Sequence, residues 1–451
     1  MVKARRNTFN SPKPDAPRLL AYDIFSEVNR RGGYSNLLLP QALTSSSFEQ
    51  RDKGFVTELV YGTLRMQGRH DYILSRVFDR PFQEVDEGIV DICRLGVHQL
   101  FEMRVATHAA VSATVELARK VLGESKASFV NAILRKVSVK TLEEWLAPVL
   151  QVSDPVSRLS IQFSHPEWIV SAYFDLLKDF TRVESELSAN NVPAMPTLVS
   201  WPGSSTQEDL LAQGAVATVF SPYGAKFDGV PGSLDVIRHR KAGVQDEGSQ
   251  LVAIAFSQAA SSAHSILDLC AGPGGKAALI SHLCQESGKD FTANEVSEVR
   301  AQLVKKVVGK FPVWVGDGRK IASHSQTFDA IIADVPCTGL GALRRRPEVR
   351  WRRSLQDLRA LTELQRELAD AAISVLSKNG IFAYATCSPH FAETFGQVKM
   401  ILKDHPELEQ IDVTPYLPVG LKGAVRDQCM ALWTSVHDTD SMFLALFKKS
   451  A

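Results

Sequence analysis

The sequence predicts a multidomain protein in which an all-α bundle and a small α+β linking domain precede a doubly wound α/β domain. The first observation is that apolar residues recur at three- and four-residue spacing throughout the first third of the chain. The second is that short β-branched runs alternate with amphipathic helices from about residue 242 onward, which is typical of a mostly parallel sheet. With 451 residues, the chain is also too long for one ordinary domain.

These patterns divide the chain into four regions. Residues 1–15 are basic and contain proline without an apolar run, which predicts a flexible tail. Residues 16–140 repeat apolar positions at helical spacing between Gly, Pro and polar breaks, which predicts a compact helical bundle. Residues 141–240 mix short apolar runs with prolines and are expected to form the linking unit. Residues 241–451 hold the α/β domain, and their last part, 432–449, is expected to form a strand pair.

Composition fits a globular protein with full cores, since 45% of residues are hydrophobic and 22% are charged. No apolar run is long enough to span a bilayer and no secretory leader is present, so we expect no membrane partner and a cytoplasmic monomer. The six cysteines include no CxxC pair and are too sparse for a disulfide scaffold. They are expected to be thiols in a reducing compartment.

Five short runs are predicted as strands of the α/β domain: 265–270, 291–296, 313–317, 328–336 and 380–387. Helical patterns lie between several of them, at 276–286, 297–309 and 354–378. Ligands of doubly wound sheets bind in a crevice at the carboxyl ends of the strands. Polar residues that follow these runs are therefore the candidates for a site.

A glycine-rich turn, AGPGGK, follows the first of these strands and precedes a helix, so its N–H groups can face a polar ligand. A nucleotide-binding Walker A loop is disfavoured, because Cys270 and Ala277 stand where it needs Gly and Ser or Thr. A dinucleotide loop is disfavoured because the third glycine is missing. A nucleoside cofactor without a pyrophosphate, such as S-adenosylmethionine, fits better, and Glu295 after the second strand suits ribose hydroxyls. A glycine cluster without a ligand remains the alternative.

Two acids close later strands of the same domain. Asp317 ends the 313–317 run and is placed to meet an adenine, whereas Asp334 ends the next strand and is placed to meet a methionine group or a substrate base. For both acids, capping of a loop is the alternative, since Asp is common in turns.

Two cysteines, Cys337 and Cys387, also follow strand ends and therefore face the predicted crevice. A thiolate that adds to C6 of a pyrimidine makes C5 nucleophilic enough to accept a methyl group. The alternative for any cysteine is a small buried hydrophobe, which we favour for Cys93, Cys284 and Cys429.

A cluster of arginines lies between the two cysteines. Their charges could favour a thiolate, but contact with RNA phosphates is the preferred interpretation. The cluster consists of Arg344, Arg345, Arg346, Arg350, Arg352 and Arg353.

The order of these motifs resembles that of the RNA cytosine-C5 methyltransferases, the class that includes the Nop2/NSUN proteins. The resemblance is carried by GVQDEGSQL (243–251), LDLCAGPGGK (267–276), GDGR (316–319), DVPCTGLG (334–341), RRRPEVRW (344–351) and YATCSPH (384–390) with Glu393.

The helical first third resembles the NusB-like RNA-binding domain that is fused to this catalytic domain in the RsmB/Fmu/Sun family of 16S ribosomal RNA methyltransferases. The resemblance runs from about residue 16 to the C-terminus. It implies a NusB-like bundle, a Rossmann-like class I methyltransferase domain and S-adenosyl-L-methionine as cofactor. It also implies 16S ribosomal RNA as partner, either free or in an early assembly intermediate.

The resemblance further implies roles for single residues. Cys387 would attack C6, Cys337 would assist release of the adduct, and Asp334 would lie near cofactor and base. The implied cofactor contacts are Cys270, Ala271, Gly272, Pro273, Gly274, Gly275, Lys276, Glu295, Asp317 and Asp334. Alternatives are the same chemistry on transfer RNA or another RNA, and a non-catalytic RNA-binding factor.

Overall fold

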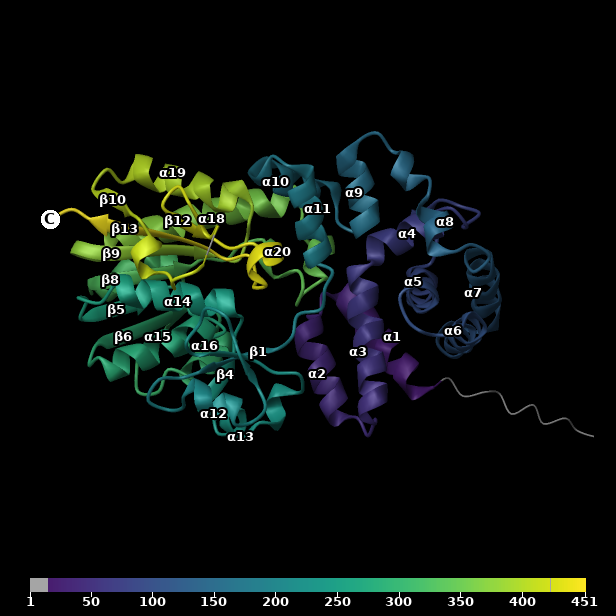
Figure 1. Ribbon diagram of the computed structural model, residues 1–451, viewed down its shortest axis with the longest axis horizontal. Helices are drawn as coiled ribbons and strands as arrows, with labels where there is room; N and C mark the ends of the chain where they lie inside the picture. The colour runs from purple at the N-terminus through teal and green to yellow at the C-terminus, as the bar shows by residue number, and fades with distance from the viewer. Residues whose placement is uncertain (1–14, 422) are drawn as a thin grey trace, which may run out of the picture. The chain divides into compact units, whose positions relative to one another are not determined.

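The computed structural model describes residues 15–421 and 423–451 of the chain (Figure 1). The predicted tail, residues 1–15, lies outside these residues except for Asp15. Two compact units are present. The helical unit comprises the chain up to Val170 together with Arg346–Trp351, and the α/β unit comprises Ser171–Arg345 and Arg352–Ala451.

The helical unit confirms the all-α prediction for the first third of the chain. Its helix α1 begins after Asp15, whose side chain accepts a hydrogen bond from the Arg18 N–H at 2.9 Å, and ends at Gly32 in the left-handed region. Apolar side chains at helical spacing, such as Phe25 and Leu59, are fully buried in its core. The helices are α1 Ala16–Arg31, α2 Ser35–Ser45, α3 Gln50–Arg65, α4 Gln67–Ser75, α5 Glu87–Phe101, α6 Thr107–Leu122, α7 Glu124–Val137, α8 Leu142–Leu146 and α9 Pro155–Phe163.

A short segment from much later in the chain, Arg346–Trp351, belongs to the helical unit. Arg350 is fully buried and donates a hydrogen bond from Nη1 to the Ser164 carbonyl at 3.0 Å. Trp351 donates its indole N–H to the Leu64 carbonyl at 2.8 Å. Both side chains thus satisfy carbonyl groups of the helical unit.

The α/β unit contains a small antiparallel sheet with strand order β2-β3-β1-β4. Its strands are β1 Thr197–Ser200, β2 Val216–Ala217, β3 Gly224–Lys226 and β4 Ala242–Val244. Helices near this sheet in the chain are α10 Glu167–Leu177, α11 Phe180–Ala189, α12 Gln207–Leu211 and α13 Asp235–Arg238. The apolar core of this part includes Leu198, Leu210 and Ala225.

The large sheet confirms the doubly wound prediction. Its order is β11-β12-β13-β9-β8-β5-β6-β7, with β10 paired to β13, and the strands from β9 to β7 in this order are parallel. The chain runs outward from β5 to β7 and then returns to the other side of β5, so the order switches between β5 and β8. Such a switch point opens a ligand crevice at the strand ends. The strands are β5 Ser265–Asp268, β6 Asp290–Glu295, β7 Val313–Val315, β8 Phe328–Asp334, β9 Leu376–Thr386, β10 Leu408–Ile411, β11 Val425–Arg426, β12 Cys429–Ala431 and β13 Phe443–Lys449.

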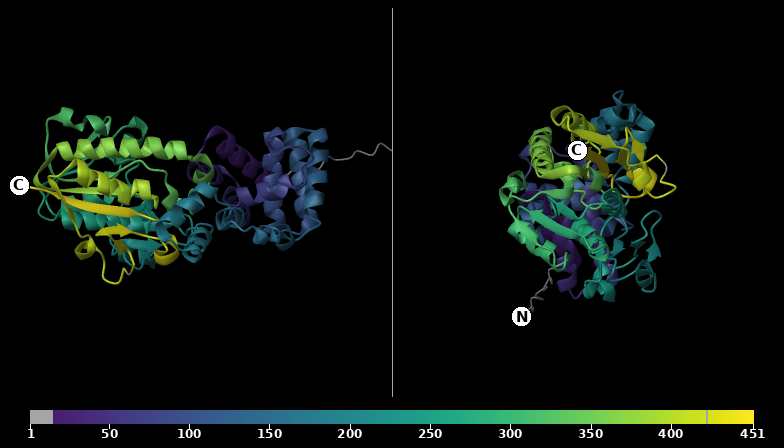
Figure 2. Two further views of the ribbon diagram at one scale, coloured as in Figure 1. Left: turned by 90° about the horizontal axis from the view of Figure 1, so that it is seen from above. Right: turned by 90° about the vertical axis from the view of Figure 1, so that its left-hand side faces the viewer.

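Helices cover both faces of the large sheet (Figure 2). Along β8, Ala330 and Ile332 join the core that α14 and α15 share, whereas the alternate residues Ile331 and Ala333 are buried toward the other face. Burial on both faces explains why this strand reads as a continuous apolar run. The main helices are α14 Glu247–Ala259, α15 Gly275–Glu286, α16 Glu298–Lys305, α18 Leu355–Ser374 and α19 Phe395–Asp404.

The expected strand pair at 432–449 is only half correct. β13 forms and pairs antiparallel with β9, but its further partners are β10 and β12, and β12 ends at Ala431. A helical turn, α20 Thr434–His437, occupies the intervening residues. The Trp433 N–H donates to His437 Nδ1 at 2.9 Å and Asp438 adopts a left-handed conformation, and both features end an extended run.

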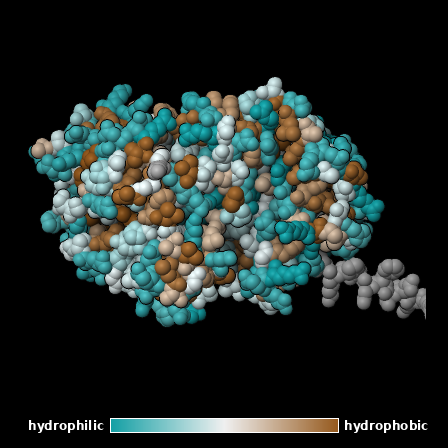
Figure 3. All heavy atoms as spheres, viewed as in Figure 1, coloured by the Kyte–Doolittle hydropathy of each residue, from teal (hydrophilic) through white to brown (hydrophobic). Residues whose placement is uncertain are grey.

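Within residues 15–421 and 423–451, no helix has the length and apolar character needed to cross a membrane. Figure 3 shows one face of the molecule, on which hydrophilic side chains predominate and apolar ones are interspersed. Exposed apolar side chains of this kind are normal on protein surfaces.

Candidate active site

The predicted site residues come from the carboxyl ends of neighbouring parallel strands. Cys270 follows β5, Glu295 ends β6, Asp334 ends β8 and Cys387 follows β9. Because β6, β5, β8 and β9 are consecutive in the sheet, these residues share one edge. This is the edge at which the sequence predicts a crevice.

The glycine loop after β5 approaches Glu295 so closely that a side chain has no room. The Gly272 N–H donates to Glu295 Oε2 at 3.0 Å, and a Cβ on Gly272 would lie 2.2 Å from the same oxygen. Gly274 has a φ of 119°, which residues with a side chain rarely adopt. Gly275 then opens α15, so the start of this helix faces the crevice.

Glu295 is buried, with 3% of its surface exposed, but its carboxylate is well supplied with donors. Besides the Gly272 N–H, it accepts the Ser297 N–H at 2.8 Å and pairs with Arg300 Nη2 at 2.6 Å. The loop after β5 and the start of α16 are thus tied to the end of β6 through one carboxylate.

Lys276 and Asp334 bridge the switch point between β5 and β8. Lys276 Nζ donates to Asp334 Oδ2 at 2.8 Å. Burial opposes the charge of Lys276, but the charge and hydrogen bond of Asp334 outweigh burial, so the pKa of Lys276 is raised. The site therefore holds a charged lysine and a carboxylate side by side.

Asp268, at the end of β5, is a candidate that the sequence reasoning missed. Its side chain is buried and accepts the Cys270 N–H at 3.3 Å. Burial and then the charge of Asp334 raise the pKa of Asp268 to about 7. Its place as the last strand residue in the LDLC run is the signal that could have identified it.

Asp317 caps the short helix η4 Gly318–His324, as the loop-capping alternative anticipated. Its carboxylate accepts the Arg319 N–H at 3.0 Å and also pairs with the Arg319 guanidinium. The hydrogen bond from Arg319 is the main cause of a lowered pKa for Asp317. A contact with an adenine stays a prediction.

The two thiols that the sequence predicted at the crevice lie next to each other. Cys337 Sγ and Cys387 Sγ are 3.4 Å apart, although the residues are fifty positions apart in the chain. The hydrogen bond with Cys387, burial, and the charges of Glu393 and Asp334 all raise the pKa of Cys337. Cys337 therefore keeps its proton and can donate it to Cys387 Sγ.

Two cations respond to charge at Cys387. Negative charge at Cys387 is among the interactions that raise the pKa values of Lys276 and Arg345, for which burial alone would act in the opposite direction. These cations favour negative charge at Cys387, and the hydrogen bond that Cys337 can donate across the 3.4 Å between the sulfurs acts in the same direction.

A buried carboxylate, Glu393, fixes the loop that carries Cys337. It accepts the Thr338 N–H at 2.8 Å and the Gln365 side-chain amide at 3.0 Å. Gln365 also donates to the Pro336 carbonyl at 3.0 Å, and the Tyr384 hydroxyl donates to the Glu393 carbonyl at 2.9 Å. Hydrogen bonds from buried side chains therefore fix the residues on both sides of Cys337, Pro336 and Thr338.

The arginine cluster is not a uniform surface for phosphates. Arg344 is buried and donates to Asp438 at 2.6 Å, Arg345 pairs with Asp440, and Arg350 is buried in the helical unit. Since Arg344 and Arg350 are buried against partners within the protein, their placement does not support contact with RNA phosphates, whereas the Arg345 side chain stays 41% exposed. Phosphate contacts by Arg345 and by the partly exposed Arg346, Arg352 and Arg353 stay a prediction.

The remaining cysteines fit the expected core positions. Cys93, Cys284 and Cys429 are buried, and burial raises the pKa of Cys284 and of Cys429 to about 12. Protonated thiols of this kind act as small apolar side chains.

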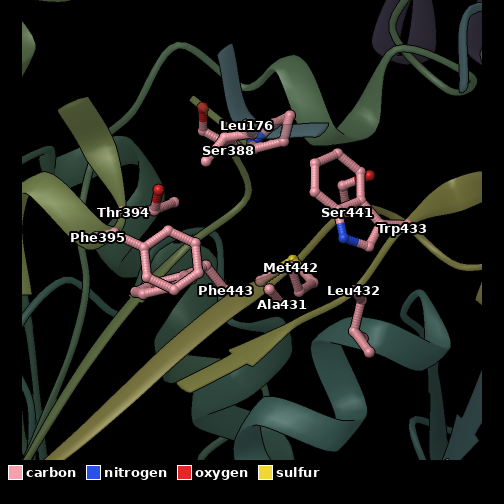
Figure 4. A pocket seen from close by; sticks show the side chains of 11 residues that line it. Leu176, Ser388, Thr394, Phe395, Ala431, Leu432, Trp433, Ser441, Met442 and Phe443 are labelled. Carbon is pink, nitrogen blue, oxygen red and sulfur yellow. The ribbon is translucent and has the colours of Figure 1, made fainter. Parts of the chain in front are cut away.

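A small hollow lies beside Ser388, the residue after Cys387 (Figure 4). Most of its lining is apolar, from side chains such as Phe395, Trp433 and Met442. None of the lining residues belongs to the glycine loop. The hollow is therefore separate from the cofactor crevice.

Comparisons with known proteins agree with this division. Residues 256–448 match the family described as 16S rRNA methyltransferase RsmB/F, and residues 15–139 match the NusB family. The chain is 40% identical over 446 residues to a methyltransferase of Mycobacterium tuberculosis, covering 96% of this chain and 97% of the relative. It is 31% identical over 420 residues to ribosomal RNA small subunit methyltransferase B of Pseudomonas putida, covering 88% of this chain and 91% of the relative.

Solved structures share the fold. The crystal structure of PH0851 aligns with a TM-score of 0.79 and 19% identity, covering 97% of this chain and all of that one. NSun6 from Pyrococcus horikoshii aligns with a TM-score of 0.54 and 17% identity, covering 63% of this chain and 98% of that one. At these identities, the likeness concerns the arrangement of helices and strands.

Proposed function

The chain belongs to the RsmB/F family of 16S rRNA methyltransferases, and from this premise we propose that it methylates C5 of a cytosine through a covalent adduct with Cys387. The observation that carries the proposal is the pair of thiols 3.4 Å apart at the strand-end crevice, with two cations, Lys276 and Arg345, whose pKa values respond to negative charge at Cys387. The base of the RNA would enter this crevice.

S-adenosyl-L-methionine is the cofactor, and it supplies an electrophilic methyl group. The glycine loop fits such a ligand, because Gly272 and Gly274 carry no side chain that could keep the ligand away from the backbone N–H groups. Its N–H groups would bind the cofactor, and Glu295 would accept the ribose hydroxyls. Asp317 would lie at the adenine and Asp334 toward the methionine end or the base. The loop contacts would extend over Cys270, Ala271, Gly272, Pro273, Gly274, Gly275 and Lys276.

Cys387 is the proposed nucleophile. Its thiolate adds to C6 of the cytosine, and the electron pair displaced from the ring makes C5 nucleophilic toward a methyl group. The Lys276 and Arg345 charges favour the thiolate before attack. Asp334, placed 2.8 Å from Lys276, would hold the polar edge of the base.

Cys337 is proposed to act in the release step. After methyl transfer, C5 carries both a proton and the new methyl group. Once the Cys387 sulfur is bonded to C6, it no longer carries the negative charge that holds the proton on Cys337, so Cys337 can release this proton to water. The Cys337 thiolate then removes the proton from C5, the C5–C6 double bond forms again, and the C6–sulfur bond breaks to return Cys387 as thiolate. Its loop, held by Glu393, keeps the sulfur close to the reacting carbon.

The proposed substrate is 16S ribosomal RNA, either free or in an early assembly intermediate, in the cytoplasm and with a monomeric enzyme. Chemistry on a ring atom requires that the base leave its stack, so a loop or helix-end cytosine is expected. The NusB-like helices and the partly exposed Arg346, Arg352 and Arg353 would contribute RNA contacts.

Bisulfite mapping of ribosomal RNA tests this function. We expect one protected cytosine in 16S RNA from cells that contain the protein, and its conversion when the protein is absent. Purified protein is expected to transfer labelled methyl groups to deproteinised 16S RNA. Transfer only to transfer RNA would overturn the choice of substrate, and absence of transfer to any RNA would favour a non-catalytic binding factor.

Glu295→Gln is expected to weaken cofactor affinity about tenfold, because charged hydrogen bonds contribute roughly 1.5–3 kcal/mol. The amide would also present a donor toward the Gly272 N–H and disturb the loop. Calorimetric titration with S-adenosylmethionine measures the change. The control is Glu298→Gln, which removes an exposed carboxylate from the first turn of α16. Equal affinity of Glu295→Gln and the unaltered protein would refute the ribose contact.

A further inference from the structure

The segment that follows Cys337 lies directly on the main chain of Cys387. The Gly341 N–H donates to the Cys387 carbonyl at 2.9 Å, and the Gly341 carbonyl accepts the Ser441 N–H at 2.9 Å. A Cβ on Gly341 would lie 2.2 Å from the Ser441 carbonyl and 2.8 Å from that of Cys387. The close approach therefore requires glycine and fixes the start of the arginine cluster beside the thiol.

One helical turn later, Arg345 is held by a buried carboxylate. Its Nε donates to Asp440 Oδ1 at 3.1 Å, and its Nη2 binds the other oxygen. The Asp440 side chain is only 2% exposed, whereas that of Arg345 is 41% exposed. Nη1 makes no hydrogen bond within the described residues. The guanidinium is thus anchored along one edge and open along the other.

The anchor is itself fixed. The Asp440 N–H donates to Asp246 Oδ1 at 3.0 Å, and the same oxygen accepts the Gly248 N–H at the start of α14. Burial and then the charge of Asp440 raise the pKa of Asp246 to about 6, while Arg345 opposes this rise. Arg345, and more weakly Arg344, therefore offset the repulsion between two adjacent buried carboxylates.

We propose that Arg345, anchored by Asp440, is a positioning residue that stabilises the thiolate of Cys387 before it attacks the base. This rests on the proposed function and assigns a role to one member of the arginine cluster. Arg344 cannot take that role, because its guanidinium is buried against Asp438. Negative charge at Cys387 contributes, after the charges of Asp440 and Asp246, to the raised pKa of Arg345.

Other groups also lie around Cys387. Lys276 on α15 acts in the same direction as Arg345, and the Cys337 thiol, 3.4 Å away, can donate a hydrogen bond to a Cys387 thiolate. Asp334 after β8 and Glu393 in the short helix η6 Phe391–Glu393 are the carboxylates whose negative charge raises the pKa of the neighbouring Cys337. Loss of Arg345 removes one of the two cations that favour the thiolate, so a measurable shift follows.

The test is the rate at which iodoacetamide alkylates Cys387 between about pH 6 and pH 9, followed by mass spectrometry of the Cys387 peptide in the full chain. For Arg345→Gln, we expect the profile to move upward by about one pH unit and alkylation at neutral pH to slow about tenfold. Arg345→Lys keeps the charge and is expected to shift the profile less. In the double variant Arg345→Gln/Asp440→Asn, the Asp440 carboxylate that Arg345→Gln leaves without its partner is also removed. The alkylation profile of this variant is still expected to lie at higher pH than that of the unaltered protein.

The matched control is Arg359→Gln, which removes an exposed arginine from α18 and is expected to leave the profile unchanged. An unchanged profile in both Arg345→Gln and the double variant would overturn the proposal. Weakened RNA binding in Arg345→Gln without a change in the alkylation of Cys387 would also overturn the proposal, because it would indicate that Arg345 binds an RNA phosphate. If Arg345→Gln fails to fold, Arg345→Lys serves as the test instead, because lysine keeps the positive charge. A pH profile of Cys387 alkylation in Arg345→Lys that equals the profile of the denatured protein would contradict a role for this charge. Alkylation needs neither RNA nor cofactor, so its outcome is independent of methyl transfer.

Discussion

Cys387→Ala is expected to abolish methyl transfer and, with it, every covalent complex between the protein and RNA. C5 of cytosine is a poor nucleophile until a thiolate has added to C6, and Lys276 and Arg345 favour negative charge at Cys387. The loss in turnover should be on the order of 10⁴-fold or more, as for other removed nucleophiles. Transfer of labelled methyl groups to 16S RNA and a denaturing gel measure the two effects.

The matched control is Cys284→Ala, since this cysteine is buried on α15 and packs among apolar residues. It is expected to lower stability slightly while keeping turnover and adduct formation. Calorimetric binding of S-adenosylmethionine should be unchanged in Cys387→Ala, which separates loss of chemistry from loss of fold. An adduct that persists in Cys387→Ala would transfer the role of nucleophile to Cys337.

Cys337→Ala is expected to have the opposite effect on the adduct, which should accumulate as a band that survives denaturation. Addition and methyl transfer do not need the Cys337 sulfur, but removal of the C5 proton does in the proposed mechanism. Turnover is expected to fall about 10²- to 10³-fold, the range for loss of a general base. The band should carry labelled methyl groups, because it forms after methyl transfer.

The double variant Cys337→Ala/Cys387→Ala is expected to form no band, which shows that the trapped bond belongs to Cys387. A single Cys337→Ala variant with normal turnover and no band would show that another group removes the proton. Glu393 and Asp334 are the carboxylates that influence Cys337, so they would be examined next.

Much of the site could be predicted because it depends on local patterns and one topological rule. The runs at 328–336 and 380–387 have the composition of buried strands; Cys337 follows the first and Cys387 closes the second. Once they are placed as parallel neighbours, their carboxyl ends lie at the same edge of the sheet, which brings the two cysteines near each other. The 3.4 Å between the sulfurs also depends on the loop after β8, which Glu393 and Gln365 hold. The glycine loop was also predictable from a local pattern, because the glycines of AGPGGK show directly where the backbone carries no side chain.

The arginine cluster could not be resolved from the sequence, because the partners that distinguish its members are remote. Arg344 and Arg345 find Asp438 and Asp440 more than ninety residues later, and Arg350 finds the Ser164 carbonyl far upstream. Charge alone gives six equivalent arginines. Only tertiary contacts distinguish Arg344 and Arg350, which are buried and support the fold, from Arg345, which stays partly exposed near Cys387.

The segment Arg346–Trp351 also affects the order in which the protein can be completed during synthesis. The helical unit leaves the ribosome first, yet the Ser35 hydroxyl donates to Glu348 at 2.7 Å and the Leu64 carbonyl accepts from Trp351. These partners exist only after translation has passed residue 351. The N-terminal helices of the nascent chain therefore cannot complete their packing until most of the α/β unit has been synthesised. Folding of the helical unit thus depends on how far synthesis of the α/β unit has advanced.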